Sequence, residues 1–88
     1  PDSHYILDSL AWAYFKKEDF EIASKLMEEV TIMAPGEAIS LDHLGDIYFA
    51  MGREREAIYM WKQANDLAEP EDNIIGGIQK KLEMYDAG

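Results

Sequence analysis

Apolar residues recur along the chain three and four residues apart, the spacing at which side chains share one face of an α-helix. The clearest series are Leu7, Leu10, Ala11 and Tyr14, and then Ala23, Leu26, Met27, Val30 and Met33. Four breaks interrupt the series, at residues 16–19, 34–36, 51–53 and 69–71. They hold the charged residues, prolines and glycines that end helices. The pattern predicts five helices, over residues 3–16, 19–33, 37–51, 53–68 and 72–86.

The pattern also repeats with a period of 34 residues, since DSLAWAYF at 8–15 is followed by DHLGDIYF at 42–49. Shifted by this period, equivalent positions hold similar side chains: Leu7 and Leu41, Leu10 and Leu44, Tyr14 and Tyr48, Ala23 and Ala57, Met27 and Trp61. A partial third copy continues the series with Ile75, Ile78 and Leu82. The chain therefore holds two helix pairs followed by one further helix.

Each unit carries one motif of large and small residues at matching places. The motif is Leu10-Ala11-x-x-Tyr14, Ala23-x-x-x-Met27, Val30 and Pro35 in the first unit, and Leu44-Gly45-x-x-Tyr48, Ala57-x-x-x-Trp61, Ala64 and Pro70 in the second. This motif resembles the tetratricopeptide repeat, and the resemblance covers nearly the whole chain. It implies an all-α fold, an α-solenoid of helical hairpins forming a right-handed superhelix. It also implies one domain over residues 1–88, with repeats at about 3–36 and 37–70 and a capping helix at about 72–86.

The small residues of the motif have a physical reason. Gly45 and its equivalent Ala11 let the second helix of each pair approach closely, and Trp61 is expected to fill the core between helices. Two positions depart from the pattern. Glu18 stands where the second unit has Gly52 between its helices, and Gln79 takes the small position of the third copy.

The two ends of the chain differ in polarity. From Tyr5 to Phe15 only Asp8 and Ser9 interrupt an apolar segment, and a helix that is apolar nearly all round is normally buried. We therefore expect a further unit upstream, with Pro1 as its closing proline. The alternatives are self-association through this helix, and aromatic side chains that fold over it locally.

The last helix has the polarity of a cap. Its expected inward stripe consists of Ile74, Ile75, Ile78, Leu82 and Tyr85, and the residues expected to cover its outer side are Gln79, Lys80, Lys81, Glu83 and Asp86. Such a helix closes the apolar end of a repeat array.

The resemblance also implies where a partner would bind. In tetratricopeptide arrays the first helices of the repeats line a concave surface on which partner peptides lie. Here the corresponding residues are Tyr5, Asp8, Trp12 and Phe15 of the first unit and Ile39, Asp42, Asp46 and Phe49 of the second.

The chemistry of this stripe narrows the partner. Tetratricopeptide domains that grip acidic chaperone tails carry basic residues here, whereas this chain has three aspartates, with Lys16 and Lys80 the only positive charges expected nearby. That function is therefore rejected, and we expect a protein or peptide with apolar anchors and a Lys or Arg. The alternatives are that Trp12 packs on the neighbouring first helix or an upstream unit, and that the aspartates are ordinary solvated residues.

Charge and composition exclude several other classes. With 18 acidic and 8 basic residues the net charge is −10, which disfavours nucleic acid and anionic membranes as partners. No apolar run approaches the ~18 residues of a membrane span. Cysteine is absent, which excludes disulfides and thiolate sites. The segments beginning at Asp8 and Asp42 also resemble repeats of bacterial envelope and lipoprotein-type tetratricopeptide proteins, so the cytoplasm and a bacterial periplasm or envelope both remain open.

Candidate catalytic and metal-binding residues are few. His43 with Asp42 and Asp46, and His4 with Asp8, lie close enough in sequence to share a ligand, but further ligands at suitable spacing are missing. We therefore expect no enzyme activity, no metal and no cofactor. The expected function is a protein–protein interaction scaffold or adaptor, and the alternative is a module that self-associates through the first helix to form a homo-oligomer.

Overall fold

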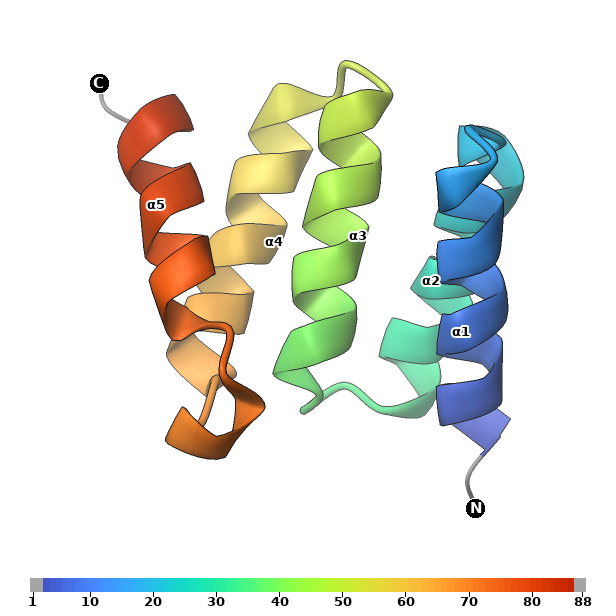
Figure 1. The fold of residues 1–88 in the computed structure, drawn as a ribbon, viewed down its shortest axis with the longest axis horizontal. Coiled ribbons are helices and arrows are strands. Elements are labelled where there is room, and N and C mark those ends of the chain that lie inside the picture. Colours follow the sequence, from blue (N-terminus) through green and yellow to red (C-terminus); the bar gives the residue numbers. More distant parts are fainter. Residues whose placement is uncertain (1–2, 87–88) are drawn as a thin grey trace.

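The computed structural model describes residues 3–86, which form an all-helical protein (Figure 1). Its α-helices are α1 (Ser3–Lys16), α2 (Phe20–Met33), α3 (Ala38–Ala50), α4 (Glu54–Leu67) and α5 (Ile75–Tyr85), with a short 3₁₀ helix η1 (Pro70–Asp72) before α5. No strand occurs in this part of the chain. The predicted all-α fold of five helices is confirmed, and Pro1 lies outside the described residues.

The fifth helix begins later than predicted. Residues 70–72 form the separate turn η1, and Asn73 then adopts a left-handed conformation with φ of 57°. The Asp72 carboxylate accepts a hydrogen bond from the backbone N–H of Glu69 at 2.9 Å, which closes the turn. A left-handed residue cannot continue an α-helix, so α5 begins at Ile75 instead of residue 72.

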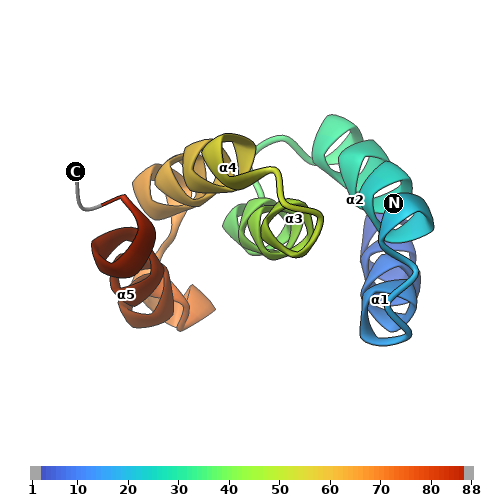
Figure 2. The same ribbon diagram turned by 90° about the horizontal axis from the view of Figure 1, so that it is seen from above.

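The helices pack in the order of the sequence and form an arch. Each helix packs on the one that follows it, and the packing is densest within the pairs α1–α2 and α3–α4. Seen from above, α1, α3 and α5 line the inner side of the arch and α2 and α4 its outer side (Figure 2). The consecutive packing is that of a small helical-repeat arrangement.

The turns within the two helix pairs share one geometry. Glu18 and Gly52 both have positive φ, 64° and 82°, and they lie 34 residues apart. In the first turn Asp19 N–H donates to Tyr14 O, and in the second Arg53 N–H donates to Tyr48 O, both at 2.9 Å. The repeat seen in the sequence is thus a repeat of backbone structure.

The core confirms the role expected of Gly45. A Cβ atom on Gly45 would lie only 2.4 Å from Cδ1 and Nε1 of Trp61, too close for any real contact. The Trp61 side chain is 2% exposed, as expected for a core residue. Absence of a side chain at position 45 therefore allows α4 to pack its largest residue directly on α3.

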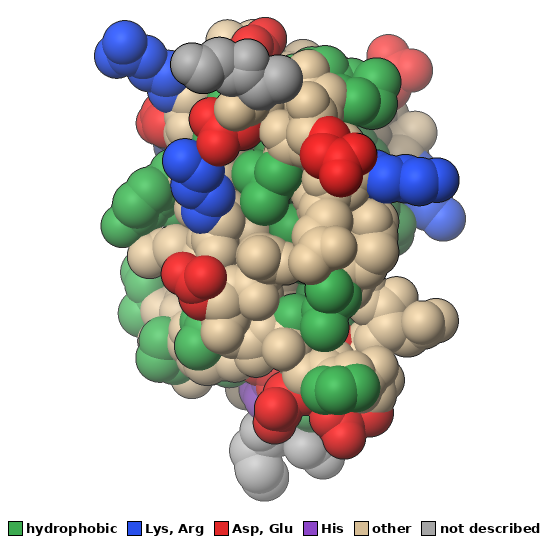
Figure 3. Space-filling model, turned by 90° about the vertical axis from the view of Figure 1, so that its left-hand side faces the viewer, with side chains coloured by type: hydrophobic (Ala, Val, Ile, Leu, Met, Phe, Trp, Pro, Cys, Tyr) green, Lys and Arg blue, Asp and Glu red, His purple; other side chains and the backbone are tan. Residues whose placement is uncertain are grey.

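The two ends of the arch differ as the sequence suggested. On α1, Ile6 and Leu10 are exposed. On α5, Ile78 is buried and Leu82 packs against the core, as does Ile74 just before the helix. Seen from the α5 side, acidic and basic side chains are interspersed with apolar ones over this end of the molecule (Figure 3). None of the helices within residues 3–86 is long and apolar enough to cross a membrane.

One residue of the expected outer side of α5 points elsewhere. Gln79, Lys80, Glu83 and Asp86 are exposed, but Lys81 is partly buried against α3. Its ammonium pairs with Asp42 and Asp46. The expectation that Lys81 covers the outer surface is therefore wrong, because two carboxylates on the inner side of the arch attract it.

Candidate functional site

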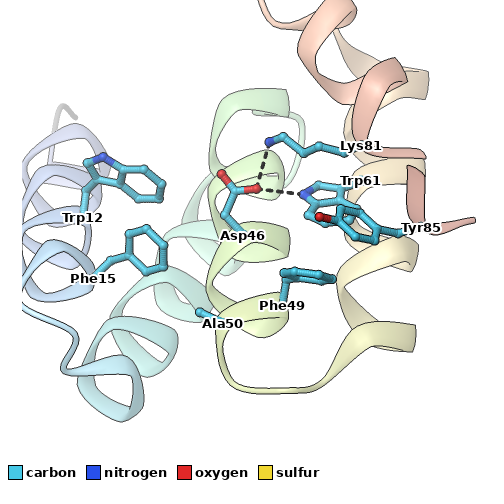
Figure 4. Close-up of a pocket in the computed structure, with 8 residues that line it drawn as sticks. All are labelled: Trp12, Phe15, Asp46, Phe49, Ala50, Trp61, Lys81 and Tyr85. Carbon is cyan, nitrogen blue, oxygen red and sulfur yellow. Dashed lines mark hydrogen bonds and ion pairs between the residues drawn. The ribbon is translucent and has the colours of Figure 1, made fainter. Parts of the chain in front are cut away.

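A cleft of about 350 Å³ opens on the inner side of the arch, and we call it the aromatic cleft (Figure 4). Its lining residues come from all the helices except α2: Trp12, Phe15, Asp46, Phe49, Ala50, Trp61, Lys81 and Tyr85. Four of the eight predicted stripe residues, Trp12, Phe15, Asp46 and Phe49, thus lie around one cavity. The two residues on α1 and the two on α3 are each three positions apart, which turns them to the same side of their helix.

Aromatic rings form two facing walls of this cleft. On α1 the rings of Trp12 and Phe15 stack with centroids 4.6 Å apart. On the opposite side Phe49 of α3 contacts Tyr85 of α5 at 4.4 Å and Trp61 of α4 at 5.7 Å. Figure 4 shows the Trp12 and Phe15 rings extending from α1 toward α3, with Phe49, Trp61 and Tyr85 grouped on the other side of Asp46. An apolar side chain from a partner would find aromatic surface on both sides.

A charged cluster lies at the edge of the cleft. Lys81 Nζ donates to Asp42 Oδ1 and to Asp46 Oδ1, each at 2.8 Å. Asp46 Oδ1 also accepts a hydrogen bond from Trp61 Nε1 at 3.1 Å. The sequence predicts Lys80 as the neighbour of these aspartates, but the lysine that reaches them is Lys81, the next residue along α5.

The cluster also shifts the ionisation of its members. Burial raises the pKa of Asp42 above its usual range, although the hydrogen bond from Lys81 opposes this. Burial alone would lower the pKa of Lys81, but its hydrogen bonds to Asp42 and Asp46 outweigh that effect and raise it. Lys81 is therefore held as a cation at neutral pH.

Asp8 takes part in a separate network between α1 and α3. Its carboxylate accepts a hydrogen bond from Ser40 Oγ at 3.2 Å, and its other oxygen lies 3.0 Å from His43 Nδ1. Trp12 stacks on the same imidazole, with ring centroids 4.1 Å apart and planes inclined by 23°. Asp8 is thus not an ordinary solvated residue. Trp12 packs on α3, the first helix of the neighbouring unit, which is one of the alternatives that the sequence left open for it.

Three of the four remaining predicted residues lie at the other end of the inner face. Tyr5, Asp8 and Ile39 line a smaller hollow of about 190 Å³ together with Glu37. The Tyr5 hydroxyl donates to Glu37 Oε2 at 3.3 Å. The predicted stripe therefore spans two hollows on one face, with Asp42 joined to the aromatic cleft through Lys81.

Sequence reasoning missed four lining residues of the aromatic cleft: Ala50, Trp61, Lys81 and Tyr85. Trp61 was expected to pack in the core, and its indole edge also reaches the cleft. Tyr85 was assigned to the inward stripe of the cap without reference to a site. Lys81 carried a usable signal, because it lies 34 residues after Ile47, which is completely buried. A charged residue at a core position of the repeat indicates that an oppositely charged group lies close to it, because burying an unpaired charge is costly.

No arrangement in residues 3–86 groups three or more side chains suited to hold a metal ion. His43 faces Asp8 instead of Asp42 and Asp46. His4 Nε2 lies 3.8 Å from Oε2 of Glu37, the residue just before α3, so the acid near it is Glu37 instead of Asp8. His43 and the three aspartates considered as metal ligands are thus paired with other protein groups, whereas the buried Nε2 of His4 has no hydrogen-bond partner among the described residues.

A scan of the chain against models of known protein families finds no match, and a search of curated protein sequences finds no significant match.

Proposed function

We propose that this protein is an interaction scaffold of the tetratricopeptide type, which binds a peptide segment of a partner protein on its inner face. The observation that carries the proposal is the aromatic cleft, where aromatic side chains of four helices surround one cavity. In this role the protein would carry out no reaction of its own.

The chemistry of the cleft suits a peptide anchor. Aromatic side chains dominate the binding energy of many protein interfaces because they bury a large surface with little loss of conformational freedom. The cleft is lined by Trp12 and Phe15 on one side and by Phe49 on the other. An apolar side chain of the partner that enters it would therefore meet aromatic rings on both sides. The net charge of −10 favours association with a basic partner.

The proposal is tested with an array of immobilised peptides that combine an apolar anchor with lysine or arginine. The double variant Trp12→Ala/Phe49→Ala should lower affinity about 30-fold, the loss expected when central aromatic anchors are removed. Tyr59→Ala is the matched control, because Tyr59 is an exposed aromatic residue of α4 that does not line the cleft. Binding that survives in the double variant, with helicity unchanged, would exclude the cleft as the site.

A second function is favoured by a separate observation, the exposed apolar side of α1. Ile6 is 72% exposed and Leu10 is 47% exposed. Such a surface favours association with another apolar surface, here a second copy of the chain. Light scattering over a range of concentrations tests this, since Ile6→Glu should abolish a dimer while helicity is retained. A chain that stays monomeric at every concentration would exclude self-association.

A further inference from the structure

We propose that Lys81 is an internal competitor for the partner, since it occupies the place where a lysine or arginine of the bound peptide would lie. The inference rests on the proposed function and defines the partner more closely. The ligand is a basic peptide whose apolar or aromatic side chain enters the aromatic cleft while its neighbouring cation replaces Lys81 at Asp42 and Asp46.

The first support is that the groups around the Lys81 ammonium form a binding site for one cation. Two carboxylates of α3 contact its Nζ, each at 2.8 Å. The same Nζ lies 5.4 Å from the ring centroid of Trp61, where the face of an indole attracts a positive charge. Any lysine or arginine delivered to this point would find the same groups.

The second support is the way in which α5 is attached at this point. The helix packs along α4, and two of its long side chains, Lys81 and Tyr85, reach across to Asp42 and Phe49 of α3. The Lys81 side chain is 28% exposed, and its flexible four-carbon stem can move into solvent while α5 stays in place. The cation can therefore be exchanged without unfolding the helix.

The third support is the balance of charge. Asp42 and Asp46 together carry two negative charges, and Lys81 neutralises one of them, so the site remains acidic with its internal lysine bound. An acidic peptide is repelled from such a site, whereas a basic peptide is attracted even before it displaces Lys81.

The adjacent lysine gives a matched control. Lys81→Gln and Lys80→Gln remove the same charge from neighbouring positions of α5, but Lys80 is exposed and makes no contact with Asp42 or Asp46. The change in net charge is the same in both variants, so an effect of net charge alone would change both equally. Competition at the aspartates would change only the first.

The probes are two fluorescein-labelled peptides in which phenylalanine is followed, after a short alanine spacer, by arginine or by glutamine. Fluorescence anisotropy at neutral pH measures their binding to the full chain. We expect the arginine probe to bind Lys81→Gln about fivefold more tightly than wild type. Lys80→Gln should match wild type for this probe, and the glutamine probe should not distinguish the variants.

Two results overturn the inference in different ways. If the arginine probe binds wild type through Trp12 and Phe49 but gains nothing from Lys81→Gln, then Lys81 does not compete and the proposed function stands alone. If neither probe binds any variant, the proposed function fails and the inference falls with it. Should Lys81→Gln lose helicity, Lys81→Met keeps the apolar stem, removes the charge and is expected to show the same gain.

Discussion

Helices α1 and α3 carry the same pattern of residues and differ in what covers them. Leu44 is 3% exposed on α3, whereas Leu10 at the equivalent position of α1 is 47% exposed. Ser40 of α3 and Ile6 of α1 are also at equivalent positions. Here the polar serine is buried on α3, whereas the apolar isoleucine is exposed on α1. α3 lies between α2 and α4, while α1 packs chiefly on α2. The difference shows that a repeat helix needs neighbours on both sides to bury its apolar residues.

The largest expected effect that tests this comparison is on stability. Leu44→Ala should lower the free energy of unfolding by about 3 kcal/mol, because it leaves a cavity in a packed core. Leu10→Ala should cost under about 1 kcal/mol, since water already reaches that side chain. Urea unfolding followed by circular dichroism measures both. Equal losses in the two variants would mean that α1 is covered in solution, as it would be in a self-associated form.

The small positions of the two units should also respond differently. Gly45→Ala places a methyl group against the Trp61 indole and should cost about 2 kcal/mol through overpacking. The equivalent Ala11 already carries a methyl group, so Ala11→Gly should cost only about 1 kcal/mol, chiefly through helix propensity. Thermal unfolding of the two variants checks the order. A neutral Gly45→Ala would show that Trp61 is free to move away from α3.

A smaller effect is expected at the turns. Glu18 adopts a left-handed conformation that glycine accepts more readily, so Glu18→Gly should raise the free energy of unfolding by about 0.5 kcal/mol. Gly52→Ala should lower it by about 1 kcal/mol for the same reason, although there is space for the methyl group. Thermal unfolding measures both variants. The change in the free energy of unfolding should have opposite signs in Glu18→Gly and Gly52→Ala, and equal signs would contradict the prediction.

The smallest effect concerns alkaline pH. Burial, and then the hydrogen bond that Tyr48 donates to Glu28, raise the pKa of Tyr48 to about 12. A raised folded-state pKa contributes stability that is present below the ordinary value near 10 and is lost as the pH rises toward about 12. Tyr48→Phe should therefore reduce the loss of stability in this window. An absorbance titration of Tyr48→Phe should also lack the tyrosine that ionises at about pH 12, and an unchanged titration would contradict the assignment.

Much of the fold follows from local pattern. The helices of residues 3–67 lie within one or two residues of their predicted limits, because apolar spacing and turn residues act within a few positions of the chain. The delayed start of α5 was not predictable in this way. It depends on a left-handed Asn73 and on the closed turn before it, which the sequence does not distinguish from a first helical turn.

The candidate site was predictable in its position more than in its chemistry. Helical spacing placed Trp12 and Phe49 on the faces of α1 and α3 that meet one cleft. It could not show that Asp8 engages His43, or that Lys81 engages Asp42. These pairs join residues on different helices, and long side chains choose among several partners that only the packed structure brings within reach.

By itself, the sequence determined the helices, the 34-residue period, the apolar end at α1 and the face on which the aromatic residues gather, because each depends on the regular turning of a helix. The tertiary structure alone decided which residues meet across helices. It turned Lys81 inward and brought Tyr85 against Phe49. It also left Ile6 exposed where Ser40 is buried. The physical reason is that burial and charge pairing depend on neighbouring helices, whose placement is set by packing over the whole arch.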